Sequence, residues 1–136
     1  MNDRYFFRGK KLDSGVWVYG GCYWWDDKPY IVQKDVWDKN PLLANMIEID
    51  TTTIGQNTTR KDIHNNTIYE NDIVKVFGII GVVEFWFGIG GWTVDTPDGA
   101  HIRWSNNEIL WDFSPANIEV IGNTHDNSEL LERVKL

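Results

Sequence analysis

The chain consists of short apolar runs, rarely longer than eight residues, separated at short intervals by Gly, Asn, Asp and Thr. This spacing is typical of many short strands joined by turns. We therefore predict a mainly β fold: a single domain of short antiparallel strands, with a barrel-like portion of the SH3 or OB kind and a short C-terminal helix. The predicted strands cover residues 4–8, 16–25, 30–34, 46–49, 73–77, 82–87, 92–95, 101–104 and 118–121.

The clearest strand signal covers residues 16–25. Apolar side chains alternate on both faces of this run, with Val18 on one face and Trp17 on the other. Apolar groups on both faces predict a central or sandwiched strand. The pair Gly20-Gly21 in the middle predicts a bend or bulge of the kind that curls a sheet toward a barrel.

Turn residues divide the second half of the chain. Gly78 and Gly81 interrupt the run 73–87 and predict a hairpin there. The segment 96–99, Thr-Pro-Asp-Gly, predicts the turn of another hairpin, since Pro suits the second position and Gly closes the turn in the left-handed conformation.

The remaining segments predict loops and short helices. Residues 35–45 and 50–66 show no clear period and are predicted as loops, and residues 108–113 as one helical turn. Asp126 with Glu129 three residues later has capping-box spacing and predicts the start of the C-terminal helix.

The aromatic content changes this picture. The chain of 136 residues contains 8 Trp, 5 Tyr and 6 Phe, which exceeds what one small core can hide. Tyr and Trp are enriched at protein interfaces. Because a large exposed apolar patch is costly for a monomer, we expect the protein to form a homo-oligomer.

Charge and cysteine usage narrow the class of protein. The formal net charge is −7, and residues 62–136 carry four basic and twelve acidic groups. Such an acidic protein repels DNA unless a basic patch is concentrated on one face, so nucleic acid is a poor default partner. Cys22 is the single cysteine, which fits a reducing compartment. Since no apolar span approaches membrane length, we expect a cytoplasmic protein without membrane contact.

Few motifs point to a cofactor or to catalysis. His64, His101, His125 and Cys22 lie far apart and have no metal-ligand spacing. The segment 88–91, Gly-Ile-Gly-Gly, lacks the last glycine and the helix of a dinucleotide fingerprint and predicts a β-turn. Cys22 lies in an apolar strand, where cysteine is usually an inert small hydrophobe. We therefore predict no cofactor, no metal and no catalytic residues.

The best enzymatic hypothesis uses three carboxylates. Glu70 and Asp72 are two apart in what we expect to be extended chain, so both should point to one face, and Glu84 follows in the next strand. Such a group can divide acid and base roles or bind a divalent ion. The simpler interpretation is that Glu70 and Asp72 accept hydrogen bonds from amides of the preceding loop.

Three sequence blocks, in order, resemble the YopX-like family of phage and prophage proteins. The first is an aromatic-Arg-Gly-Lys pattern, a turn and Trp17-Val18-Tyr19-Gly20. The second, and most specific, runs from Ile54-Gly55-Gln56-Asn57-Thr58 through Lys61-Asp62 to Ile68-Tyr69-Glu70-Asn71-Asp72-Ile73-Val74. The third is Ile118-Glu119-Val120-Ile121-Gly122-Asn123 with Asn127, Glu129 and Leu130-Leu131. The resemblance implies phage or prophage origin, a mostly β fold with a barrel-like portion and homo-oligomeric assembly. It implies no catalytic residues.

The chain departs from the family pattern at two turns. Family members usually have Gly where Thr59 stands, and Asn-Gly where Asn65-Asn66 stand. Asn tolerates the left-handed region, so we expect Asn66 to keep its turn, whereas Thr59 cannot do so easily.

Candidate binding residues come from the middle block and from the aromatic loops of the first half. They are Gln56, Asp62, Tyr69, Glu70, Asp72, Trp25 and Trp37.

We hypothesise a non-catalytic, self-associating β module that binds a host or phage protein. The alternative is a barrel that binds single-stranded nucleic acid, and a second alternative is a carboxylate- or metal-dependent hydrolase. The nucleic-acid alternative requires basic residues to converge on an aromatic groove, namely Arg4, Arg8, Lys10, Lys11, Arg60 and Lys61.

Overall fold

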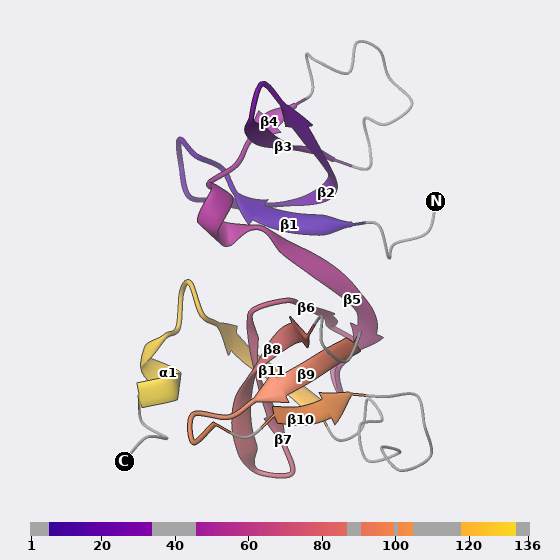
Figure 1. Ribbon diagram of the computed structural model, residues 1–136, viewed down its shortest axis with the longest axis vertical. Coiled ribbons are helices and arrows are strands. Elements are labelled where there is room, and N and C mark those ends of the chain that lie inside the picture. Colours follow the sequence, from indigo (N-terminus) through magenta and orange to yellow (C-terminus); the bar gives the residue numbers. More distant parts are fainter. Residues whose placement is uncertain (1–5, 34–45, 87–90, 100, 105–117, 133–136) are drawn as a thin grey trace. The chain divides into compact units, whose positions relative to one another are not determined.

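The computed structural model describes residues 6–33, 46–86, 91–99, 101–104 and 118–132 (Figure 1). The chain divides into two compact units, Met1–Asn57 and Thr58–Leu136. The expectation of a single domain stays a prediction, because two compact units can still fold as one cooperative domain. The loop predicted over residues 35–45, which includes Trp37, and the helical turn predicted over 108–113 lie outside the described residues.

The mainly β fold with a short C-terminal helix is confirmed. All strand pairs are antiparallel wherever the structure gives a register. The elements are β1 (Phe7–Lys10), β2 (Trp17–Trp25), β3 (Lys28–Gln33), β4 (Ile47–Glu48), the 3-10 helix η4 (Thr51–Thr53), β5 (Gly55–Lys61), β6 (Thr67–Tyr69), β7 (Asp72–Val76), β8 (Ile79–Trp86), β9 (Gly91–Asp95), β10 (His101–Trp104), β11 (Ile118–Asn123) and α1 (Glu129–Glu132).

The first unit contains β1 to β4 and the start of β5, which belong to a six-stranded sheet in the order β4-β3-β2-β1-β5-β6. A bridge between Lys11 and Ile49 brings the end of β4 back to the end of β1. The four strands β1 to β4 therefore curl around a small core of Val18, Ile31 and Ile49. Because a single bridge joins β4 to β1, the described strands form no closed barrel, and the barrel-like prediction holds only as this curl.

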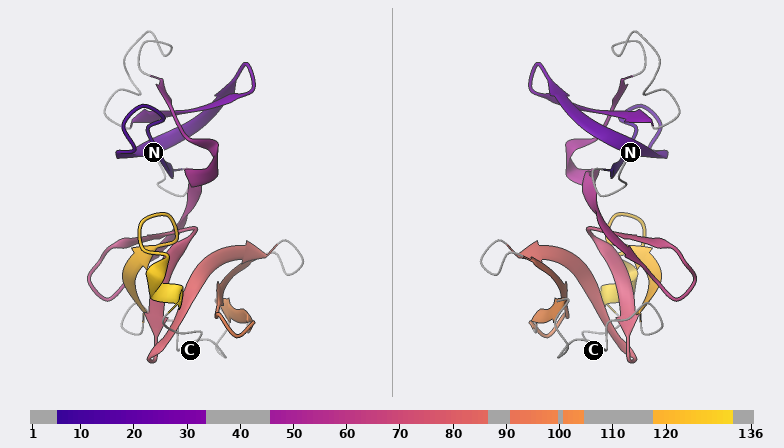
Figure 2. Two further views of the ribbon diagram at one scale, coloured as in Figure 1. Left: turned by 90° about the vertical axis from the view of Figure 1, so that its left-hand side faces the viewer. Right: turned by 90° about the vertical axis from the view of Figure 1, so that its right-hand side faces the viewer.

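The glycine pair of β2 has a different role from the one predicted. The pairing of β2 with β3 runs through Gly20 and Gly21 without a register shift, and the pairing with β1 ends at Gly20. Of the predicted bend or bulge, the bulge is therefore wrong. A Cβ atom at Gly20 would lie 2.1 Å from the carbonyl oxygen of Val32. Glycine is needed here because the two backbones approach closely. Figure 2 shows the resulting hairpin of β2 and β3 extending away from the other strands of its unit.

The second unit is built on a sheet in the order β10-β9-β8-β7-β11. Its core is a cluster of aliphatic side chains from four of these strands and from β6. The members are Ile68, Val74, Val76, Val83, Val94 and Ile118, with Trp92 and Val120 packed against them. Strand β11 also carries a register shift between Val120 and Gly122, which the sequence pattern did not predict.

Strand β5 overturns the prediction that residues 50–66 form a loop. Its sequence, GQNTTRK, has no apolar alternation, yet Asn57 and Thr58 are buried. The amide of Asn57 donates to the carbonyl of Phe6 at 3.0 Å, and Thr58 Oγ1 donates to the carbonyl of Ile68 at 2.7 Å. Hydrogen bonds to neighbouring backbone, rather than apolar packing, therefore fix this strand.

Left-handed backbone occurs at both places where the chain departs from the family pattern, within β5 and in the turn that follows it. Thr59 has φ 68°, although it is β-branched and such residues rarely occur there. In the following turn the left-handed residue is Asn65, at φ 65°, and not Asn66 as expected. The hairpin predicted around Gly78 and Gly81 is also narrower than expected, since Gly81 lies within β8.

Candidate binding surfaces

The carboxylate of Asp62 is a buried hydrogen-bond acceptor just after the end of β5. Its Oδ1 accepts from the backbone amides of His64 at 2.9 Å and Asn66 at 2.8 Å. Its Oδ2 accepts from the amide of Val120 in β11 at 3.0 Å. One side chain therefore holds the β5–β6 turn in shape and fastens that turn to β11.

These contacts change the acidity of Asp62. Burial by itself raises the pKa of the carboxyl group, because it disfavours the charged form. The three backbone amides, together with the Asn66 side chain, stabilise the carboxylate and lower the pKa. The net result is a pKa below the usual range of aspartate. Asp62 is thus held as an anion whose acceptor positions are already used within the fold.

Asp72 and Tyr69 also serve the local fold. The Oδ2 atom of Asp72, which is 2% exposed, accepts a hydrogen bond from the amide of Tyr69 at 2.7 Å. Glu70 and Asn71 form the turn between β6 and β7, and Asn71 is left-handed with φ 72°. The prediction that Glu70 and Asp72 share one face of an extended strand is therefore wrong. Asp72 does accept a hydrogen bond from preceding backbone, but the donor is the amide of Tyr69 in β6 and not an amide of the preceding loop.

The structure does not assemble the three carboxylates into a metal site. Asp72 is buried, whereas Glu70 and Glu84 are half-buried in the turn and in β8. Over the described ranges, no three side chains of His, Cys, Asp or Glu lie close enough together to hold a metal ion. No observation here favours the hydrolase alternative.

The other candidate residues lie in the first unit. Gln56 is exposed on β5 opposite Phe7, and Trp25 is 59% exposed at the end of β2. Trp37 lies outside the described residues. Cys22 is half-buried in β2, and burial raises the pKa of its thiol. A raised pKa leaves less thiolate at neutral pH and supports the interpretation of Cys22 as unreactive.

One face of β1, β2 and β3 carries aromatic rings and cations. Cross-strand partners share a face, and the register pairs Lys10 with Trp17, Tyr23 with Tyr30 and Trp25 with Lys28. We call this surface the aromatic face. Its members are Arg8, Lys10, Trp17, Tyr19, Tyr23, Trp25, Lys28 and Tyr30.

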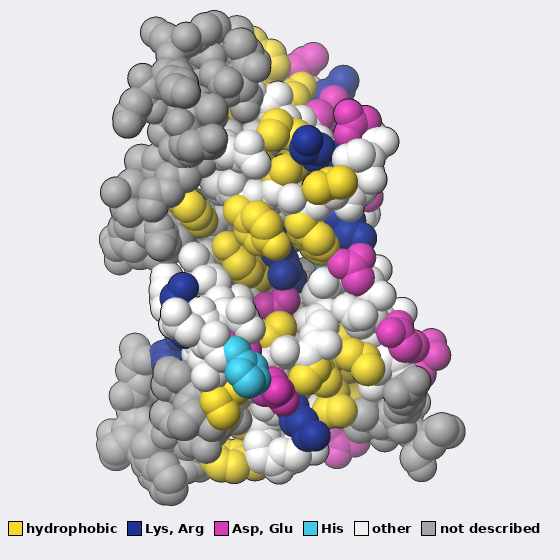
Figure 3. Space-filling view, turned by 180° about the vertical axis from the view of Figure 1, so that it is seen from behind, with side chains coloured by type: hydrophobic (Ala, Val, Ile, Leu, Met, Phe, Trp, Pro, Cys, Tyr) yellow, Lys and Arg dark blue, Asp and Glu magenta, His cyan; other side chains and the backbone are white. Residues whose placement is uncertain are grey.

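The rings of the aromatic face are only partly covered. Tyr19, Tyr23 and Trp25 are 45%, 44% and 59% exposed, and Trp24 on the opposite face is 60% exposed. Hydrophobic side chains with Lys or Arg between them gather in the upper part of Figure 3. The premise that the small interior cannot hold all the large rings is therefore correct for β2.

Two cations stack on the same ring. The guanidinium carbon of Arg8 lies 4.7 Å from the centroid of the Trp17 ring, and Lys10 Nζ lies 5.3 Å from it. These distances are within the range of cation–π attraction. Arg8 is itself buried, so this corner of the aromatic face is a packed platform.

The second unit has a shallow hollow between the β5–β6 turn and the β7–β8 hairpin. Ile63 and Phe77 form apolar walls. His64 Nε2 lies 3.1 Å from Glu119 Oε2, and Lys75 also lines the hollow. Figure 3 shows a histidine beside an acidic and a basic side chain on this face of the molecule. Phe77 is not among the candidate residues predicted from the sequence, although an aromatic residue directly before the glycine of a two-residue turn is a visible signal.

Among the described residues, most of the buried polar ones lie in the sequence blocks that carry the family resemblance. The family model described as YopX protein matches residues 6–132, and the chain therefore belongs to the YopX family. A search of curated proteins found no match. The middle and last blocks of the family pattern meet in the structure, because β7 pairs with β11 and Asp62 binds Val120. Much of the family signature is thus explained by hydrogen bonding within the second unit.

Proposed function

We propose that the protein is a non-catalytic, self-associating β module that binds a protein partner, of host or phage origin, through the aromatic face. The observation that carries this proposal is the exposure of three β2 rings on this face, Tyr19, Tyr23 and Trp25, at 44–59%. Trp, Tyr and Arg dominate the energetic centres of protein interfaces. No helix among the described residues is long and apolar enough to cross a membrane, and we place the protein's action in the cytoplasm of the host cell.

The scaffold supports binding at this face. The rings project from a regular antiparallel ladder, and Gly20 holds β2 tightly against β3. A rigid platform loses little conformational entropy when a partner binds. The first unit is also nearly neutral, since residues 1–57 carry seven basic and eight acidic groups, whereas residues 58–136 carry six and twelve. A charged partner that binds the aromatic face therefore experiences little net electrostatic repulsion from this unit.

Affinity capture with matched variants tests partner binding. Immobilised wild-type protein should retain a specific host or phage protein, and Trp25→Ala should weaken the measured affinity by at least about tenfold. Val16→Ala is the control, because Val16 is 55% exposed but lies outside the aromatic face. Equal affinity of Trp25→Ala and wild type would remove the aromatic face from the proposal.

Light scattering tests self-association, and a strictly monomeric protein at micromolar concentration would contradict it.

A second candidate function is binding of single-stranded nucleic acid. It is favoured by the stacking of Arg8 and Lys10 on Trp17, since aromatic rings flanked by cations bind unpaired bases. Of the other basic residues it requires, Arg60 and Lys61 belong to the second unit and Arg4 lies outside the described residues. Titration with oligothymidine, followed by tryptophan fluorescence, tests it. Binding that weakens steeply with salt would favour this function, and no quenching at low salt would exclude it.

A further inference from the structure

Phe77 occupies an unfavourable position at the tip of the β7–β8 hairpin. Val76 pairs with Ile79, so Phe77 and Gly78 are the two central residues of the turn. Their φ angles are 52° and 82°, so both residues are left-handed, as in a type I′ turn. Asn, Asp and Gly suit the first of these positions, whereas a bulky residue there is strained. The side chain of Phe77 is 61% exposed, so packing within the protomer does not offset the strain.

The surroundings of Phe77 extend the exposed apolar surface and add a cation. Ile63 is 53% exposed and lines the same hollow as Phe77. Lys75, two residues before Phe77, lines it too and is exposed. Glu119 is the cross-strand partner of Lys75 and lines the same hollow, where its Oε2 contacts His64 Nε2. Among the described residues, no carboxylate lies within ion-pair distance of Lys75. We call Ile63, Lys75 and Phe77 the hairpin patch.

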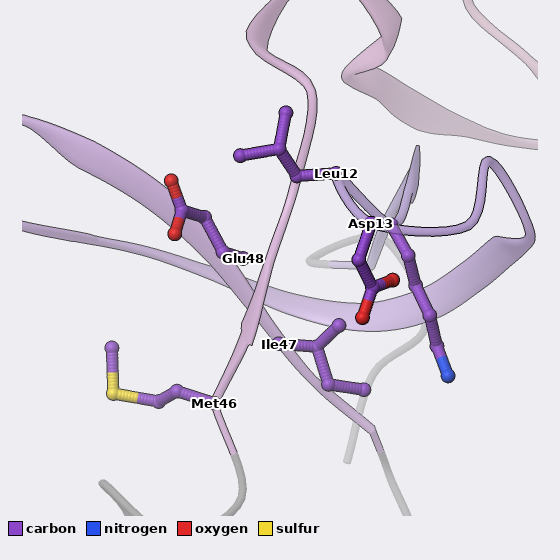
Figure 4. Close-up of a pocket in the computed structure, with 6 residues that line it drawn as sticks. Leu12, Asp13, Met46, Ile47 and Glu48 are labelled. Atoms are coloured by element: carbon purple, nitrogen blue, oxygen red, sulfur yellow. The ribbon is translucent and has the colours of Figure 1, made fainter.

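The first unit has a pocket of matching character. It measures about 590 Å³, which is in the range of pockets that bind small ligands. Leu12, Met46 and Ile47 supply apolar walls, and Leu12 is 59% exposed. In Figure 4, Met46 and Glu48 extend to one side of the β4 segment, and Ile47 extends to the other.

The pocket also carries acidic groups that fit the hairpin patch. Asp13 and Glu48 line it, together with Lys11. Within the described part of the chain, neither carboxylate forms an ion pair. The pocket thus offers apolar walls beside the carboxylates of Asp13 and Glu48, and the hairpin patch offers an aromatic ring beside the ammonium group of Lys75. The two surfaces are complementary in both hydrophobicity and charge.

We propose that the partner of the hairpin patch is a second copy of this chain. Phe77 of one copy enters the pocket lined by Leu12, Met46 and Ile47 of the next, and Lys75 lies against Asp13 and Glu48. Each copy then contributes the Phe77 side chain, which we call the knob, to one neighbour and its pocket to another. Because two different surfaces meet, the contact is heterologous. This inference rests on the self-association in the proposed function and is independent of partner binding at the aromatic face.

Complementation between two variants tests the contact. Phe77→Asn removes the knob and keeps the pocket, and Leu12→Lys blocks the pocket with a charge that repels Lys75 and keeps the knob. Each variant alone should associate at least about tenfold more weakly than wild type in sedimentation velocity. An equimolar mixture should form a one-to-one heterodimer. Trp24→Lys is the matched control, because Trp24 is 60% exposed, like Leu12, and gains the same charge.

Thermal unfolding supplies a readout that a purely structural role of Phe77 would not give. Because Asn suits the left-handed position, Phe77→Asn should raise the unfolding midpoint of the protomer while association falls. Phe77→Gly should behave in the same way. Unchanged association of the Phe77 variants, or variants that do not pair when mixed, would overturn this inference and leave the proposed function standing. A wild type that stays monomeric would remove self-association from both, and Trp25→Ala would still test partner binding.

Discussion

The Oδ2 atom of Asp62 accepts a hydrogen bond from the backbone amide of Val120 at 3.0 Å, although 58 positions separate the two residues. This contact joins the β5–β6 turn to β11. A second bond, from the amide of Ile63 to the carbonyl of Ile118 at 2.9 Å, reinforces it. The two bonds join the middle family block to the last one, and the long chain segment between them starts and ends at this contact.

Replacing Asp62 tests its structural role. Asp62→Asn keeps the shape of the side chain but removes the charge and one acceptor oxygen, so a buried amide loses a strong partner. We expect the free energy of unfolding to fall by about 1–3 kcal/mol in urea denaturation. Asp27→Asn is the control, because Asp27 is exposed and left-handed, a conformation that Asn tolerates. Equal stability of the two variants would contradict the role of Asp62.

The pH dependence of stability should report the same carboxylate. The pKa of Asp62 is lower in the folded protein than in the unfolded chain, where aspartate titrates near 3.9. Its stabilisation is therefore fully present above about pH 5 and is lost as the pH falls through the folded pKa. Urea denaturation between about pH 7 and pH 3 should show this loss in wild type. The curve of Asp62→Asn should be flatter, and parallel curves would refute the assignment.

Thr59 should be a site where glycine stabilises the protein. At φ 68° the left-handed conformation costs a residue with a Cβ about 1–2 kcal/mol, whereas glycine adopts it freely but loses about 0.5–1 kcal/mol in entropy. Thr59→Gly should therefore raise the free energy of unfolding by about 0.5–1 kcal/mol. In calorimetry, Thr67→Gly in β6 should instead lower the melting temperature. A lower melting temperature for Thr59→Gly would count against strain at this position.

Gly20 should be intolerant of a side chain. In Gly20→Ala the new Cβ would lie 2.1 Å from the Val32 carbonyl oxygen, so the β2 and β3 backbones must separate. We expect a loss of at least about 2 kcal/mol in the free energy of unfolding. Gly15→Ala is the comparison, since Gly15 is left-handed with φ 73° but has open space around it. Its loss should be about 1 kcal/mol, and losses of equal size would argue against the close approach.

The sequence predicted the strands with apolar periodicity and the turns with Gly, Pro or Asp, because both signals are local. Residues 16–25, 92–95 and 101–104 correspond closely to β2, β9 and β10. It failed for β5, whose burial depends on hydrogen bonds from Thr58 and Asn57 to partners elsewhere in the chain. It also failed for Glu70 and Asp72, because the left-handed turn at Asn71 separates them.

The sequence identified which residues are candidates for a site, and the structure showed whether each side chain is buried or exposed and what it contacts. Asp62 and Asp72 were chosen for their place in the family pattern, and their buried hydrogen bonds give them structural roles. Trp25 was chosen as an aromatic residue near a loop, and it is exposed. Phe77 could have been suspected from the Phe-Gly turn, but its exposure follows only from the position of the hairpin.

The sequence by itself determined the β class, most hairpins and membership of the YopX family, because these depend on residue periodicity, turn chemistry and motif order. The tertiary structure alone decided which apolar face of β2 stays open and which acidic groups are buried. Alternation assigns side chains to two faces of a strand, but only the packing of distant segments determines which face is covered.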